Sequence, residues 1–81
     1  MTAWEYGELI DTLQGEDDRY SRTVTWIGPD GQPAEMTGHP VKALSFLGGN
    51  GWELVSARSR EGTVPGHSWS TSTYTMKRPL A

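Results

Sequence analysis

The sequence predicts an α+β domain, an antiparallel sheet of about four to five strands with one helix packed on one face, in the order β-β-β-α-β-β. Three observations lead to this class. Segments rich in β-branched and aromatic residues, several of them alternating, lie on both sides of one segment with helical spacing. Runs rich in glycine and proline separate these segments. The length of 81 residues suits a single domain, 1–81, with a thin core.

The first expected strand begins at Trp4. Trp4 and Tyr6 share one face by alternation, but the period slips near Leu9 and leaves the register of this strand open. Residues 12–18 are polar, contain a glycine and end in three consecutive acidic residues. We expect a turn or exposed loop there, and a short helix has weaker support.

A β-hairpin is expected over residues 20–36. Its first part is dominated by β-branched and aromatic side chains. Residues 28–31 read Gly-Pro-Asp-Gly, in which the proline presets φ and the last glycine can adopt a positive φ. Pro33 lacks a backbone donor, so the returning strand suits the edge of the sheet.

One helix of two to three turns is expected at about residues 40–48. Pro40 suits the first helical position, because its missing N–H would be unpaired there in any case. Thr37 has the better capping chemistry and His39 the better position for the N-cap. The Gly-Gly-Asn-Gly run at 48–51 ends the helix with residues that tolerate left-handed geometry.

The helix has one apolar stripe that is expected to face the sheet. Val41, Leu44 and Leu47 recur at helical spacing and form this stripe. Phe46 then lies well around the helix and should be partly exposed. An exposed aromatic side chain on a small domain is a candidate contact for a partner.

Two further strands are expected at about residues 52–58 and 69–77. The segment 59–68 contains two glycines and a proline, and we expect an exposed loop. In the last strand Tyr74 and Met76 share the inward parity, and three threonines take the outward one.

Three blocks of the sequence carry a family resemblance: WEY at 4–6, LGGNGWELV at 47–55 and YTMKRPL at 74–80. In this order they resemble a family of small bacterial domains of unknown function, with related proteins in bacteriophages and the pattern WEY, LGxxGWELV, KRP. The resemblance covers most of the chain. It implies a compact antiparallel sheet with one helix packed on it, and no established activity, catalytic residue or cofactor. Gly7 and Glu8 depart from the family pattern.

The signature residues are expected to determine the fold. The glycine-rich stop reverses the chain, so Trp52 should re-enter the sheet under the helix it has just left. Aromatic side chains from the first, middle and last blocks should then meet beneath the helix. The residues assigned to this structural signature are Trp4, Tyr6, Gly51, Trp52, Leu54 and Tyr74.

The net charge of −3 is unevenly distributed. Residues 1–37 hold eight acidic and two basic residues, a net of −6, and residues 38–81 hold five basic and two acidic residues, a net of +3. We expect the two halves to pair in one sheet and their charges to intermix; the alternative is a basic patch for an acidic partner. The absence of cysteine excludes disulfides and thiolate metal sites and favours a reducing cytoplasm. No apolar stretch is long enough for a membrane span.

No catalytic, cofactor-binding or metal-ligating residue is assigned from the sequence. His39 and His67 are far apart, and adjacent acidic residues such as 16–18 are usually a solvated loop. His67 precedes Ser68, but sequence neighbours rarely point at each other, so a small hydrolytic enzyme is a remote alternative.

The preferred hypothesis is a non-catalytic interaction or regulatory module with a protein partner. A homodimer could form through a sheet edge or the helix face. The alternative is a single-stranded nucleic-acid accessory protein that uses the basic C-terminal half, although the net acidity makes nucleic acid unlikely as a partner. The candidate interaction surface comprises Trp26, Phe46, Trp69, Arg58 and Arg60.

Overall fold

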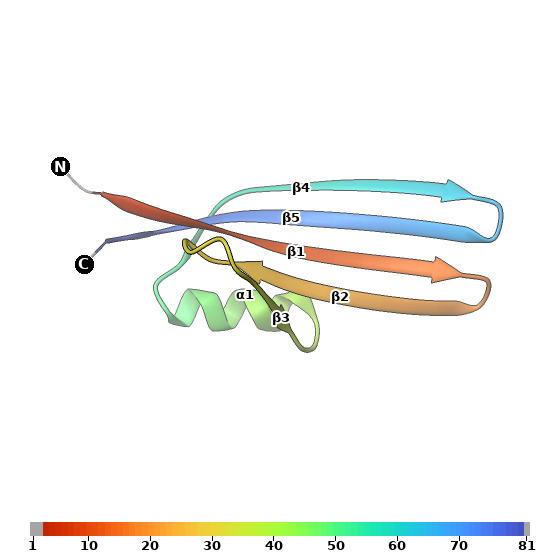
Figure 1. Ribbon diagram of the computed structural model, residues 1–81, viewed down its shortest axis with the longest axis horizontal. Coiled ribbons are helices and arrows are strands. Elements are labelled where there is room, and N and C mark those ends of the chain that lie inside the picture. The colour runs from red at the N-terminus through yellow and green to blue at the C-terminus, as the bar shows by residue number, and fades with distance from the viewer. Residues whose placement is uncertain (1–2, 81) are drawn as a thin grey trace.

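The computed structural model describes residues 3–80 and shows a five-stranded antiparallel sheet with one helix, so the expected α+β class is confirmed (Figure 1). The strand order is β3-β2-β1-β5-β4, which places the first and last strands of the chain side by side at the centre. The elements are β1 (Trp4–Glu16), β2 (Arg19–Ile27), β3 (Pro33–Met36), α1 (Pro40–Gly49), β4 (Glu53–Val64) and β5 (His67–Pro79).

The strands extend through two segments that were expected to be loops. Residues 12–16 belong to β1, and the expected loop at 59–68 is strand except for a two-residue turn at 65–66. Both loop predictions are therefore wrong except at the two turns, residues 17–18 and 65–66. These polar segments carry no strong hydrophobic pattern, and their extended conformation comes from pairing with neighbouring strands, which local sequence does not encode.

The helix is much shorter than the sheet it covers. The molecule measures 52 × 20 × 20 Å. A strand of 13 residues such as β1 spans about 43 Å at about 3.3 Å per residue, and a helix of 10 residues spans about 15 Å at 1.5 Å per residue. Figure 1 shows α1 beside one end of the sheet, with both long hairpins running on beyond it. We refer to residues 12–16, 19–23, 60–64 and 67–71 as the outer half of the sheet.

The core is a single cluster between α1 and the near end of the sheet, formed by Leu9, Val24, Ala43, Leu47, Trp52 and Met76. The expectation that Val41 faces the sheet is wrong, because its side chain is 61% exposed. The buried residues of α1 are instead Pro40, Ala43 and Leu47. This set follows the same three-to-four spacing with a different phase, and the small side chain of Ala43 allows the helix to lie close to the strands.

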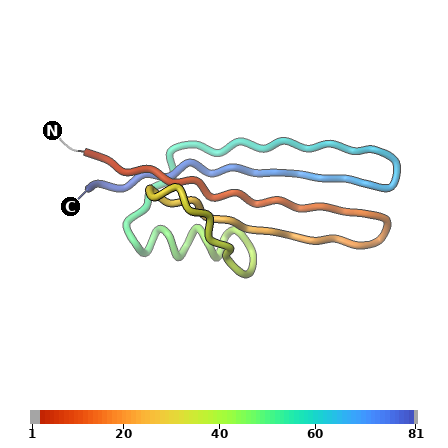
Figure 2. Tube along the Cα trace, viewed as in Figure 1, coloured from red at the N-terminus to blue at the C-terminus, as the bar shows by residue number. Residues whose placement is uncertain are grey.

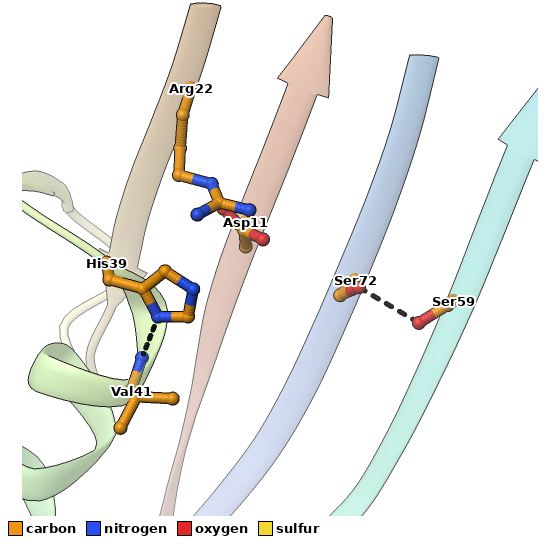
Figure 3. Close-up of polar contacts among 6 residues, drawn as sticks. All are labelled: Asp11, Arg22, His39, Val41, Ser59 and Ser72. Atoms are coloured by element: carbon orange, nitrogen blue, oxygen red, sulfur yellow. Dashed lines mark hydrogen bonds and ion pairs between the residues drawn. The ribbon is translucent and has the colours of Figure 1, made fainter.

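Both ends of α1 are capped by local hydrogen bonds. His39 is the N-cap, and its Nδ1 accepts a hydrogen bond from the backbone N–H of Val41 at 3.1 Å (Figure 3). At the other end Gly51 adopts φ 90°, and its N–H donates to Gly48 O at 3.1 Å. The N–H of Trp52 donates to Leu47 O at 3.1 Å. These two bonds form a Schellman motif, which stops the helix and directs Trp52 into the core.

The first strand turns its even-numbered residues away from the helix. Leu9 lies in the core under α1, so Trp4 and Tyr6, which have the other parity, lie on the opposite face. Tyr6 is 55% exposed, and Lys77 Nζ lies 4.0 Å from the ring centroid of Trp4. The expected meeting of these two side chains with Trp52 beneath the helix is therefore wrong.

Two glycines of β1 make room for aromatic rings on the helix side of the sheet. A Cβ on Gly7 would lie 2.5 Å from Cζ2 of Trp26 and 3.0 Å from Ile27 O, so the indole occupies the space above this residue. Gly15 stands in the same relation to Tyr20, whose ring a Cβ would meet at 2.8 Å. Aromatic rings of β2 thus cover these two glycines of β1.

Candidate interaction surface

The sheet has one face without a helix, and we call it the open face. It carries the even-numbered residues of β1, the odd-numbered residues of β2 and β5, and the even-numbered residues of β4 from Ser56 onward, after the bulge between Leu54 and Ser56. Threonine is its most frequent residue: Thr12, Thr23 and Thr71 lie in one row across three strands.

Three of the five residues predicted to form an interaction surface lie together on the open face. Arg58 and Arg60 of β4 pair with Thr73 and Thr71 of β5, and the next pair along these strands joins Gly62 to Trp69. A Cβ on Gly62 would be 2.6 Å from Cε2 of Trp69, so the indole lies across β4 at this glycine. Trp69 is 40% exposed and is the aromatic residue of the outer half on this face.

The other two predicted residues lie elsewhere. Trp26 packs on the helix side against Trp52, with ring centroids 4.9 Å apart and an angle of 73° between the planes. Trp26 is partly buried and packs against the core, so it lies on the other side of the sheet from Trp69, Arg58 and Arg60. Phe46 is 63% exposed on α1, across the sheet from the open face.

The open face is electrically balanced. Pairing of the acidic β1 with the basic β5 mixes the charges of the two halves of the chain, as the charge pattern predicts. At the far end Glu16 lies between Arg19 and His67. The basic residues of this face are Arg19, Arg58, Arg60 and Lys77, and the acidic ones are Glu8, Glu16, Glu35 and Glu53.

His67 pairs with a carboxylate across the sheet. It lies opposite Glu16 in the β1–β5 ladder and lines an open hollow of about 810 Å³ with the acidic turn at 16–18. Ser68 follows His67 and points to the other face of the sheet. Ser21 also lines the hollow, and β1 lies between its strand and β5. Nucleophilic catalysis requires the base within hydrogen-bond reach of the hydroxyl.

The buried carboxylate of Asp11 lies on the helix side. Asp11 is 7% exposed, and Nε of Arg22 on β2 lies 3.1 Å from its Oδ1 (Figure 3). This is an ion pair without a well-aligned hydrogen bond to Oδ1, so its stabilisation depends on charge proximity.

The three blocks of the family resemblance meet around one side chain that the sequence analysis missed. Arg78 forms an ion pair through its Nε with Glu5, and its guanidinium carbon lies 4.6 Å from the ring centroid of Trp52. Its Nη1 also donates to Asn50 O at 3.2 Å. Glu5 comes from WEY, Asn50 and Trp52 from LGGNGWELV, and Arg78 from KRP. The presence of all three motifs in one chain is the sequence signal that could have predicted this cluster. Of the other signature residues, Tyr74 packs on the core and Leu54 is 55% exposed.

Among residues 3–80, no group of three or more histidine, aspartate or glutamate side chains is arranged to hold a metal ion. Within the same part of the chain, no helix is both long and apolar enough to cross a membrane. Comparison of the chain with protein-family models and with curated proteins gives no match.

Proposed function

We propose that this chain is a non-catalytic interaction module that binds a protein partner through the outer half of its sheet. The observation that carries the proposal is that this half is a single layer. Gly15, which lies under Tyr20, is the one described residue of the outer half that is buried. Sheets in stable domains normally bury at least one face against another element, so a layer open on both faces is a surface suited to a partner.

The side chains of the outer half support protein contact. Trp69 presents a partly exposed indole beside Arg60 on the open face. Tryptophan and arginine are the residue types that dominate binding energy at protein interfaces. Within the outer half the open face carries Arg19, Arg60 and Glu16, and this mixture of charges favours a polar protein surface as the partner.

The far end of the outer half is tied together. The N–H of Asp17 in the β1–β2 turn donates to Gly66 O in the β4–β5 turn at 3.1 Å, and Figure 2 shows both turns at the same end of the molecule. At the inner border of the outer half, the Ser59 and Ser72 hydroxyls lie 2.9 Å apart across the β4–β5 ladder (Figure 3). Such links hold the surface in one arrangement before a partner arrives, which lowers the entropic cost of binding.

Matched aromatic variants test this proposal. The tagged chain is purified from its host as wild type, as Trp69→Ser and as Phe46→Ser, and each variant is first checked for a native amide NMR spectrum. Both residues are exposed aromatics, one on the outer half and one on the helix. We expect a partner that co-purifies with wild type and Phe46→Ser and is lost with Trp69→Ser. Loss with Phe46→Ser alone, or a wild-type chain that is recovered without any partner, would contradict the proposal.

A second candidate function, binding of single-stranded nucleic acid, has one specific observation in its favour. Trp69 together with Arg58 and Arg60 combines a stacking surface with basic groups on one open face. The balanced charge of that face and the net charge of −3 weaken the electrostatic attraction on which such binding depends. Titration of a fluorescent oligothymidylate at low salt tests it: salt-sensitive binding that quenches Trp69 supports it, and no binding at low salt removes it.

A further inference from the structure

The strand β4 forms a long, open edge of the sheet. It is the last strand in the order β3-β2-β1-β5-β4, and no described strand lies beyond it. All of its 12 residues except Gly62 are exposed. Alternate residues of an edge strand direct their backbone N–H and C=O groups outward, so β4 offers a ladder of hydrogen-bonding groups to an added strand.

The charges of β4 oppose pairing with a second copy of itself. Arg58 and Arg60 lie on the same face of the strand, two residues apart. Antiparallel pairing centred on Ser59 would place Arg58 of each copy opposite Arg60 of the other. Centring on either arginine would place it opposite its own equivalent. Like charges directly opposite each other destabilise a ladder, so these arginines protect the edge from self-association.

The same charges select an acidic strand. We infer that the β4 edge binds an extended acidic peptide segment of a partner, which adds antiparallel to β4 as a sixth strand. This inference deepens the proposed function and rests on it. Residues of the added strand opposite Arg60 and Arg58 are two apart and acidic, and the residue opposite Glu61, on the other face, is basic. Read along the added strand, this gives Lys-Glu-x-Glu, with x opposite Ser59.

Backbone pairing and charge have separate roles in this mode of binding. The ladder of main-chain hydrogen bonds supplies affinity that does not depend on sequence, and the alternate side chains supply selectivity. The β4–β5 hairpin keeps the edge straight, because its pairs run without interruption from Ser56 to the turn. The bulge between Leu54 and Ser56 limits the added strand to the outer part of β4.

A synthetic peptide tests the inference directly. The probe is a capped ten-residue peptide with Lys-Glu-Val-Glu at its centre and threonine and valine elsewhere, titrated into the wild-type chain and followed by amide NMR. We expect saturable shifts and slowed amide exchange confined to β4. The Arg58→Glu/Arg60→Glu variant should bind about tenfold or more weakly and should prefer a peptide with the charges reversed. The control Arg19→Glu/Lys42→Glu, with the same change of net charge on β2 and α1, should bind like wild type.

Two further measurements make the inference falsifiable. The same peptide with N-methyl groups along one edge keeps its charges but cannot form the ladder, and it should not bind. The Arg58→Thr/Arg60→Thr variant should self-associate in light scattering at concentrations at which the wild type does not. Binding of the N-methylated peptide, equal binding of the charge-reversed peptide to wild type, or a wild-type dimer through β4 would overturn the inference. If the peptide does not bind and the Trp69-dependent partner is still captured, the inference fails and the proposed function stands.

Discussion

The indole of Trp26 meets the indole of Trp52 edge to face, with the ring centroids 4.9 Å apart. This contact joins β2 to the segment that leaves α1, and it closes the core at the end of the helix. Trp52 is covered on another side by the guanidinium of Arg78, 4.6 Å from its ring. Trp52 therefore makes an aromatic contact with Trp26 and a cation–π contact with Arg78 at the end of the sheet that α1 covers.

Trp52→Ala should lower the free energy of unfolding by about 3–5 kcal/mol, because it leaves a cavity and removes the partner of Trp26. Urea denaturation followed by circular dichroism measures the change. Trp69→Ala is the matched control, since Trp69 is 40% exposed where Trp52 is 7% exposed, and it should lose much less stability. Equal losses for the two variants would show that the core is not where the structure places it.

Gly7→Ala should destabilise the protein by about 1–3 kcal/mol, because the added methyl group would overlap the Trp26 ring, which the core holds in place. Gly48→Ala is the control for the same chemical change. Nothing lies within 4 Å of a Cβ at this helical glycine, so the substitution should stabilise by about 0.5–1 kcal/mol. Thermal unfolding of both variants should give shifts of opposite sign, and a neutral Gly7→Ala would contradict the packing of Trp26.

Arg22→Ala should cost about 2–3 kcal/mol, because it leaves the buried carboxylate of Asp11 without its ion-pair partner. The double variant Asp11→Val/Arg22→Ala removes the charge as well and should recover most of that loss. Chemical denaturation of Arg22→Ala, Asp11→Val and the double variant completes a double-mutant cycle. A loss in the double variant equal to the sum of the two single losses would mean that the two residues act independently.

Asp17→Gly should stabilise the protein by about 0.5–1 kcal/mol, because Asp17 adopts φ 53°, where an L side chain is strained and glycine is not. The melting temperature should rise by about 2–8 °C for a domain of this size. Gly66→Ala makes the opposite change in the adjacent turn: it places an L side chain at a φ of 80° and should lower the melting temperature. Calorimetry checks both, and a lower melting temperature for Asp17→Gly would contradict the turn geometry.

Several features were predictable because their signals are local. The helix at about 40–48 is observed at Pro40–Gly49, since proline at its start and glycine after its end act within a single turn of backbone. The turn between β2 and β3 follows from its Gly-Pro-Asp-Gly sequence in the same way. Of the predicted interaction surface, Arg58, Arg60 and Trp69 lie together because they belong to one hairpin and the β4–β5 register places them on one face. Trp26 lies on the helix side instead, where it packs against Trp52, because exposure depends on what packs against a side chain.

The α+β class, the capped helix and the return of Trp52 beneath it follow from local sequence, because capping chemistry and hydrophobic period operate over a few residues. The face of β1 that lies toward the helix and the length of the strands depend instead on the assembled sheet. Leu9 is buried beside Gly7 because Trp26, from another strand, fills the space above that glycine. The polar segment 12–16 is a strand because β2 and β5 flank it. Contacts between residues far apart in the chain are made only when the whole sheet assembles, and no local pattern records them.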